Sequence, residues 1–80
     1  MEKSLFSKGY RTFLRHLRAA REEAELTQGE LAVRLRKTQS FVSKCERGER
    51  RIDVIELRTF CKAMQISFVD FIRTLDGELN

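Results

Sequence analysis

The sequence has no proline and no tryptophan, and only four glycines and two cysteines occur among its 80 residues. Because proline is absent, nothing forces a helix to kink or end, and helices are favoured throughout. The longest apolar runs are far shorter than the roughly 18 residues of a transmembrane helix. The N-terminus lacks the apolar core of a signal peptide. We therefore expect a cytoplasmic protein that does not enter a membrane.

Patterns that carry catalysis or metal binding are also missing. One histidine and two cysteines without CxxC spacing do not provide four zinc ligands. No Gly-rich phosphate loop, nucleophile–base pair or pair of catalytic carboxylates is recognisable. We expect no enzyme activity, no cofactor and no small-molecule ligand. Cys45 and Cys61 lie on predicted core-facing stripes, where free cysteine acts as a small buried hydrophobe, and we expect His16 to be an ordinary surface residue.

Length and apolar spacing predict a single domain over residues 1–80 with helices only. Apolar residues at helical spacing indicate a first helix from about Gly9 to Ala24. Asp53 begins another helix as its N-cap, and Ser67 begins the last one, over about 68–76. We expect Gly77 to end that helix. Two further helices are expected between the first helix and Asp53. The predicted fold class is therefore all-α, a compact five-helix bundle.

The two central helices lie within residues 26–48, LTQGELAVRLRKTQSFVSKCERG. Thr27 and Glu30 have the spacing of a capping box at the start of the first of them. Thr38 is a plausible N-cap for the second, which runs from Gln39 to about Arg47, with the left-handed C′ position at the following glycine, Gly48. Two short helices in close succession, the second with a polar face, predict a helix-turn-helix over about 27–48.

Charge along the chain supports a polyanionic partner. The formal net charge is +4, and residues 28–51 carry seven Lys or Arg against three Asp or Glu. Residues 52–80 carry three basic against five acidic residues. The basic excess therefore coincides with the helix-turn-helix, which predicts double-stranded DNA as the partner and an affinity that falls with salt.

This stretch resembles the helix-turn-helix of the phage repressor and Cro-like (Xre) family, and the resemblance extends over roughly residues 10–75. The matching residues are Leu26-Thr27-Gln28, Glu30-Leu31-Ala32, Gln39-Ser40, Val42-Ser43 and Cys45-Glu46-Arg47-Gly48. A small residue, often glycine, is usual at the turn after the first of the two helices, and here Arg36 or Lys37 holds that place. Either the turn is left-handed at a non-glycine residue or its geometry differs.

The second of the two helices is the expected recognition helix, and we expect four of its polar side chains to contact bases; the resemblance implies this role for Gln39, Ser40 and Lys44. Gln39 and Ser40 lie in its first turn, and Lys44 follows one turn later on the same face, with Ser43 between them. The amide of Gln39 can pair with adenine, the hydroxyl of Ser40 can bond to several bases, and Lys44 can contact guanine or a phosphate. We call Gln39, Ser40, Ser43 and Lys44 the recognition face. Phe41 either fills a gap beside Leu35 or lies at the DNA edge.

Phosphate contacts are expected around this face, at the helix N-termini and in the basic loop after the recognition helix. The candidate residues are Thr27, Gln28, Thr38, Arg47, Arg50 and Arg51. The resemblance further implies an ion pair between Arg21 and Glu46 that ties the first helix to the recognition helix. The alternative is a loose surface pair worth under about 1 kcal/mol.

The last helix has more apolar residues than one core stripe needs, and the family usually binds DNA as a symmetric dimer. We therefore predict a homodimer interface on this helix, although a core-only role is equally compatible with the pattern. The candidate residues are Phe68, Val69, Phe71, Ile72 and Leu75. The predicted function is a sequence-specific, autoregulating transcriptional regulator of the Cro/C1 repressor type, similar to restriction–modification controller proteins. The alternative is an antitoxin that neutralises a protein partner and also binds its own promoter.

Overall fold

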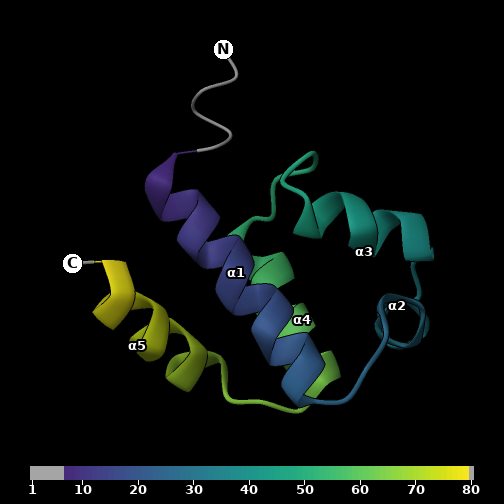
Figure 1. The fold of residues 1–80 in the computed structure, drawn as a ribbon. Coiled ribbons are helices and arrows are strands. Elements are labelled where there is room, and N and C mark those ends of the chain that lie inside the picture. The colour runs from purple at the N-terminus through teal and green to yellow at the C-terminus, as the bar shows by residue number, and fades with distance from the viewer. Residues whose placement is uncertain (1–6, 80) are drawn as a thin grey trace.

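The computed structural model describes residues 7–79, and every regular element in that range is helical (Figure 1). The elements are α1 (Lys8–Glu23), α2 (Gln28–Leu35), α3 (Gln39–Glu46), α4 (Val54–Met64) and α5 (Phe68–Leu79). The predicted all-α, five-helix fold is therefore confirmed. None of these helices is long and apolar enough to cross a membrane.

The central position of α1 organises the fold. In Figure 1, α5 lies along one side of α1, whereas α2 and α3 lie toward the other side. α4 contacts both α2 and α5 and closes the bundle from behind α1. The surface of α3 that faces away from the bundle is thus separated from α5 by the body of the domain.

Capping side chains begin the helices where the sequence predicts them. The Thr27 hydroxyl accepts a hydrogen bond from the backbone N–H of Glu30, whose carboxylate accepts from the N–H of Thr27. Asp53 and Glu56 form the same reciprocal capping box at α4. At α5, the Ser67 hydroxyl accepts from the N–H of the third residue of the helix. Such caps satisfy N–H groups that a helix itself leaves without partners.

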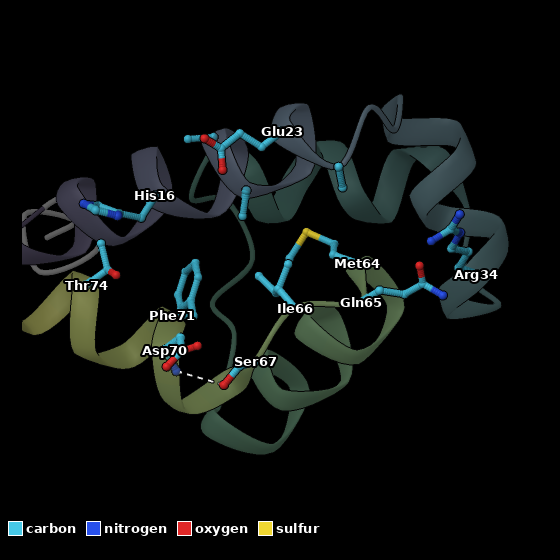
Figure 2. A pocket seen from close by; sticks show the side chains of 13 residues that line it. His16, Glu23, Arg34, Met64, Gln65, Ile66, Ser67, Asp70, Phe71 and Thr74 are labelled. Carbon is cyan, nitrogen blue, oxygen red and sulfur yellow. Dashed lines mark hydrogen bonds between the residues drawn. The ribbon is translucent and has the colours of Figure 1, made fainter.

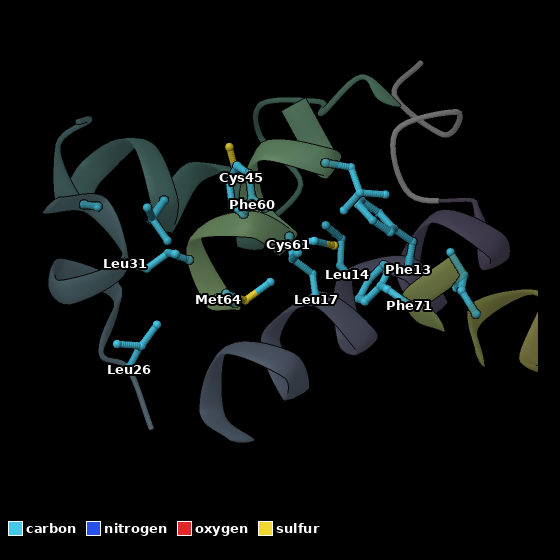
Figure 3. Packing of buried hydrophobic residues seen from close by; sticks show 14 residues of the cluster. Phe13, Leu14, Leu17, Leu26, Leu31, Cys45, Phe60, Cys61, Met64 and Phe71 are labelled. Atoms are coloured by element: carbon cyan, nitrogen blue, oxygen red, sulfur yellow. The ribbon is translucent and has the colours of Figure 1, made fainter. Parts of the chain in front are cut away.

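Fourteen buried apolar side chains form one core to which all five helices contribute (Figure 3). Leu17, Leu31 and Val42 are fully buried, and Phe60 is nearly so. Cys45 and Cys61 are free, buried thiols in this core, which confirms their prediction as small hydrophobes. Burial raises the pKa of both thiols, because the thiolate is poorly solvated there.

The predicted end of the last helix at Gly77 is wrong, since α5 continues to Leu79. Glycine often ends a helix because it readily adopts a left-handed conformation. In this chain, the left-handed residues after α1, α2 and α4 are not glycines but Glu25, Arg36 and Gln65. Inside a helix, glycine costs less than about 1 kcal/mol. The residues on both sides of Gly77 contact the rest of the domain, since Leu75 is buried and Leu79 lies beside Gly9 of α1.

Gly77→Ala is expected to stabilise the domain by about 0.5–1 kcal/mol, because alanine loses less backbone entropy in a helix. A Cβ at this position meets no atom within 4 Å. Urea unfolding followed by circular dichroism measures the effect. Gly48→Ala is the matched control and should instead destabilise, since Gly48 has a φ of 81°. A G77A variant less stable than the natural chain would contradict the helical placement.

His16 is not the ordinary surface residue that the sequence predicts. Its Nε2 atom is buried and lies 3.6 Å from Glu78 Oε1, beyond hydrogen-bond distance. The ring lies at the edge of a hollow of about 680 Å³ between α1, α5 and the α4–α5 turn. Figure 2 shows the imidazole above Thr74 and near Phe71. The apolar stripe of α1 is therefore wider than the sequence pattern indicates, because α5 covers the flank that carries His16.

The five apolar residues predicted as a dimer interface on α5 divide into two groups. Phe71 and Leu75 are buried in the core, and Phe68 packs against it, so the prediction that Phe71 and Leu75 form an intermolecular surface is wrong. Val69 and Ile72 are 61% and 37% exposed. The outer face of α5 is therefore narrower than the sequence pattern implies.

Candidate nucleic-acid interface

The turn between α2 and α3 is left-handed at a non-glycine residue. Arg36 has φ 59° and ψ 42°, and its N–H donates to the carbonyls of Ala32 and Val33. The N–H of Lys37 also donates to the carbonyl of Ala32, at 2.9 Å. These bonds satisfy the last carbonyls of α2, as in a Schellman-type ending. Of the two alternatives left open by the sequence, the structure has the left-handed turn, at Arg36.

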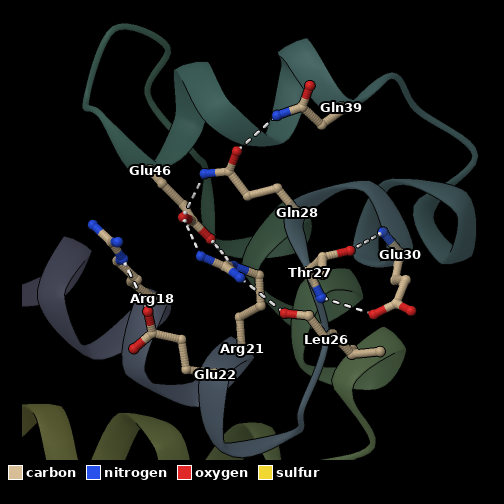
Figure 4. Close-up of polar contacts among 9 residues, drawn as sticks. All are labelled: Arg18, Arg21, Glu22, Leu26, Thr27, Gln28, Glu30, Gln39 and Glu46. Carbon is tan, nitrogen blue, oxygen red and sulfur yellow. Dashed lines mark hydrogen bonds and ion pairs between the residues drawn. The ribbon is translucent and has the colours of Figure 1, made fainter.

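A buried ion pair ties α3 to α1. Arg21 Nε and Nη2 donate to the two carboxylate oxygens of Glu46, at 2.6 and 3.1 Å (Figure 4). Arg21 Nη1 donates to the carbonyl of Leu26, at 2.8 Å. The hydrogen bond to Glu46 raises the pKa of the guanidinium, although burial opposes this. The side chains of Arg21 and Glu46 are 9% and 4% exposed, so the contact is not the loose surface pair.

From this ion pair, hydrogen bonds continue to the recognition helix. Gln28 Nε2 donates to Glu46 Oε1 at 2.9 Å, and Gln28 Oε1 accepts from Gln39 Nε2 at 2.9 Å (Figure 4). Because a carboxylate only accepts, Glu46 fixes the amide nitrogen of Gln28 toward itself and the amide oxygen toward Gln39. The first side chain of the recognition helix is therefore held by a chain of contacts that begins in the core.

Within the recognition face, three side chains are exposed and one is engaged. Gln39, Ser40 and Lys44 are exposed on α3, whereas Ser43 is half-buried. Ser43 accepts a hydrogen bond from Arg47, which also donates to the carboxylate of Glu49. Val42 and Cys45 face the core on the opposite side of the same helix. The sequence predicts all four as base-contacting residues. It does not predict the hydrogen bond from Arg47 to Ser43.

Phe41 packs within the domain. Its ring is half-buried, with the centroid 6.4 Å from that of Phe60, and it lines a small apolar hollow with Leu35 and Ile55. The charged ends of Lys37 and Arg50 lie 5.1 and 5.0 Å from the ring centroid. Of the two interpretations of Phe41, the structure favours the one in which it fills a gap beside Leu35.

Residues predicted to contact phosphate at the helix N-termini have partners within the protein. The Thr27 and Thr38 hydroxyls accept from the N–H groups of Glu30 and Phe41, and each hydroxyl keeps its own proton for donation. Gln28 directs its amide toward Glu46 and Gln39. These residues shape the N-terminal ends of α2 and α3, where helices favour anions.

The two adjacent arginines after α3 have different surroundings. Arg50 donates to Glu56 Oε1 at 2.6 Å and to the carbonyl of Arg51 at 2.8 Å. Arg50, followed by the backbone N–H of Asp53, lowers the pKa of Glu56 below its ordinary value. The Arg51 guanidinium instead lies over the ring of Tyr10, 4.2 Å from its centroid. The sequence alone does not distinguish Arg50 from Arg51, because their different contacts depend on where the fold places Glu56 and Tyr10.

Comparison with known proteins was consistent with this geometry. A sequence model of the helix-turn-helix family matches residues 17–71. A solved XRE-family-like protein from Pseudomonas syringae pv. tomato str. DC3000 is 39% identical, with a TM-score of 0.85 and 100% of both chains covered. The clp gene regulator ClgR from C. glutamicum is 26% identical over 88% of this chain and 91% of its own, with a TM-score of 0.76. Among curated proteins, none matches the chain significantly.

Within residues 7–79, no cluster of three or more His, Cys, Asp or Glu residues is placed to hold a metal ion.

Proposed function

The chain belongs to the Xre family of helix-turn-helix DNA-binding regulators, which are not enzymes, and from this we propose that it binds an inverted-repeat operator as a homodimer and regulates its own promoter. The recognition helix α3 enters the major groove with its N-terminal turn toward the bases. Two such helices, about 34 Å apart, contact the two half-sites. A single module of this size has too small an interface for strong specificity, so a dimer is needed.

The observation that carries this proposal is the position of Gln39. Its amide is fixed by Gln28, which is fixed in turn by the buried carboxylate of Glu46. Among the hydrogen bonds of the described residues, Gln39 uses one amide proton and leaves its oxygen and its second proton available. Those two groups are the ones that a glutamine uses to bind adenine at N6 and N7. Ser40 and Lys44 extend the contact along the exposed side of α3.

The outer face of α5 is the proposed dimer interface. Val69 and Ile72 are exposed at 61% and 37%, and their spacing of three residues places them on one side of the helix. This side is separate from Phe71 and Leu75, which hold α5 on the core. Figure 1 shows α5 on the side of α1 away from the pair α2 and α3, so an α5 contact leaves the recognition face open.

Selection of bound duplexes from a random DNA pool tests the function, with the mass of the free and bound protein measured in the same buffer. We expect enrichment of an inverted repeat and a mass of two chains per duplex. Enrichment of a single half-site by one chain would contradict the dimer. No enrichment at low salt would contradict operator binding and would favour the antitoxin-type interaction module.

Val69→Asp is expected to convert the dimer into a monomer, because it places a charge in the apolar contact. Sedimentation equilibrium measures the change. Val33→Asp is the matched control, since Val33 is a 76% exposed valine on α2, outside the proposed interface. If both variants remain dimeric, the interface lies elsewhere, and Ile55→Asp then tests the more exposed of the two exposed apolar residues of α4, Val54 and Ile55.

A further inference from the structure

Tyr10 connects α1 to the loop that follows the recognition helix. Its hydroxyl oxygen accepts a hydrogen bond from the backbone N–H of Ile52 at 3.2 Å, across 42 residues of sequence. The Tyr10 ring also packs on Phe13, with centroids 5.2 Å apart. Phe13 is a core residue that contacts Phe71 edge-on. Tyr10 is therefore fixed from the core on one side and holds the loop on the other.

The same ring supports an arginine. The Arg51 guanidinium carbon lies 4.2 Å from the Tyr10 ring centroid, a distance at which cation–π attraction and planar stacking operate. Arg51 is an exposed residue, and the contact with the ring restricts the rotamers of its side chain. Arg50 differs, since its guanidinium bonds to Glu56 and to the Arg51 carbonyl and lies against Phe41. Of the two neighbouring arginines, Arg50 is bonded to α4 and lies against Phe41, whereas Arg51 lies on the ring that α1 supplies.

We propose that Tyr10 is a positioning residue that presents Arg51 to a phosphate of the DNA backbone, so that α1 contributes to the DNA interface. This inference rests on the proposed DNA-binding function. The hydroxyl fixes the loop through Ile52, and the ring fixes the guanidinium of Arg51. A preorganised side chain loses less conformational entropy on binding than a freely rotating one. Arg51 supplies the charge, and Tyr10 sets where that charge lies.

The sequence contains no direct signal for this role. Tyr10 occupies an apolar position of the first helix, and its spacing to Phe13 and Leu14 predicts a core residue. The polar end of tyrosine is its distinguishing feature, because a buried or half-buried tyrosine usually finds a partner for its hydroxyl. Only the fold shows that this partner is the loop beside the recognition helix.

Salt-dependent binding of the selected operator tests the proposal in four variants: Arg51→Ala, Tyr10→Leu, Tyr10→Phe and the double variant Tyr10→Leu/Arg51→Ala. Arg51→Ala should reduce the slope of log affinity against log salt by about 0.9, the value of one phosphate contact. Tyr10→Leu should weaken binding about two- to fivefold, as expected for losing the ring–cation contact. In the double variant, Arg51→Ala should add less than it does alone. Tyr10→Phe keeps the ring and should keep the salt slope.

Arg15→Ala is the matched control, because Arg15 is an exposed arginine of α1 that pairs with Glu78 and lies away from the loop. It should leave the slope unchanged. Arg51→Lys provides a test that leaves Tyr10 intact, since lysine keeps the charge but lacks the planar group that stacks. It should bind more weakly than the natural chain. An unchanged slope in Arg51→Ala, independent effects in the double variant, or natural affinity in Arg51→Lys would each overturn the proposal. Failure of the natural chain to bind any duplex would instead refute the proposed function.

Discussion

Glu46→Ala is expected to lower the free energy of unfolding by about 3–5 kcal/mol, the largest stability effect that we predict for a single substitution. Arg21 is 7% exposed, and two of its hydrogen bonds end on the Glu46 carboxylate. Without Glu46, the guanidinium remains buried without its counter-ion, and that desolvation cost is not recovered. Such a loss is a large share of the stability of a small domain. Thermal and urea unfolding measure it.

A second ion pair of the same chemistry provides the control. Arg18 and Glu22 form an exposed contact of 3.2 Å, one turn apart on α1 (Figure 4). Glu22→Ala should leave the unfolding curve almost unchanged, because exposed pairs contribute little. Arg21→Ala should also destabilise, and the double variant Arg21→Ala/Glu46→Ala should lose less than the two single losses together. Natural-like unfolding curves for both single variants would show that the pair is energetically unimportant.

The triple variant Gln39→Ala/Ser40→Ala/Lys44→Ala is expected to lose the preference for the operator while keeping binding to unrelated duplexes. Each well-placed bidentate contact contributes about 1–3 kcal/mol of discrimination between bases. The three side chains are exposed and project from α3, so their removal does not disturb the core. Competition binding with operator and scrambled duplexes measures the ratio of the two affinities. A triple variant with the natural ratio would place base recognition on another surface.

In the same competition experiment, Gln28→Ala tests whether Gln28 positions the Gln39 side chain without contacting a base itself. Gln28 is not on the recognition face, but its amide oxygen accepts from Gln39 at 2.9 Å. Its removal should weaken discrimination at the base that Gln39 contacts and leave discrimination at the other bases intact. Lys62→Ala, an exposed substitution on α4, should change neither. The unfolding curve of Gln28→Ala must be compared as well, because Gln28 also bonds to Glu46.

The sequence predicts those features that depend on neighbouring residues. The capping patterns of Thr27, Thr38 and Asp53 begin their helices as expected, because an N-cap acts within one helical turn. The left-handed glycine at position 48 follows the recognition helix for the same local reason. The resemblance to the family also implies the ion pair between Arg21 and Glu46, which the structure contains.

Features that depend on tertiary packing could not be obtained from the sequence in this way. Gly77 has the local character of a helix end, yet packing of its neighbours on α1 extends the helix beyond it. Phe71 and Val69 are equally apolar, and only the position of α1 decides which of them is buried. The amide of Gln28 can face solvent or protein, and the buried carboxylate of Glu46 determines its direction.

The two sides of α3 have separate roles, and this separation determines which of its residues can be substituted without loss of stability. Val42, Cys45 and Glu46 hold the helix in the domain, while Gln39, Ser40 and Lys44 face outward. If these outward residues read the operator as proposed, substitutions there are expected to change the preferred operator with little cost in stability. Exchanging these three side chains between family members should transfer operator preference from one protein to another.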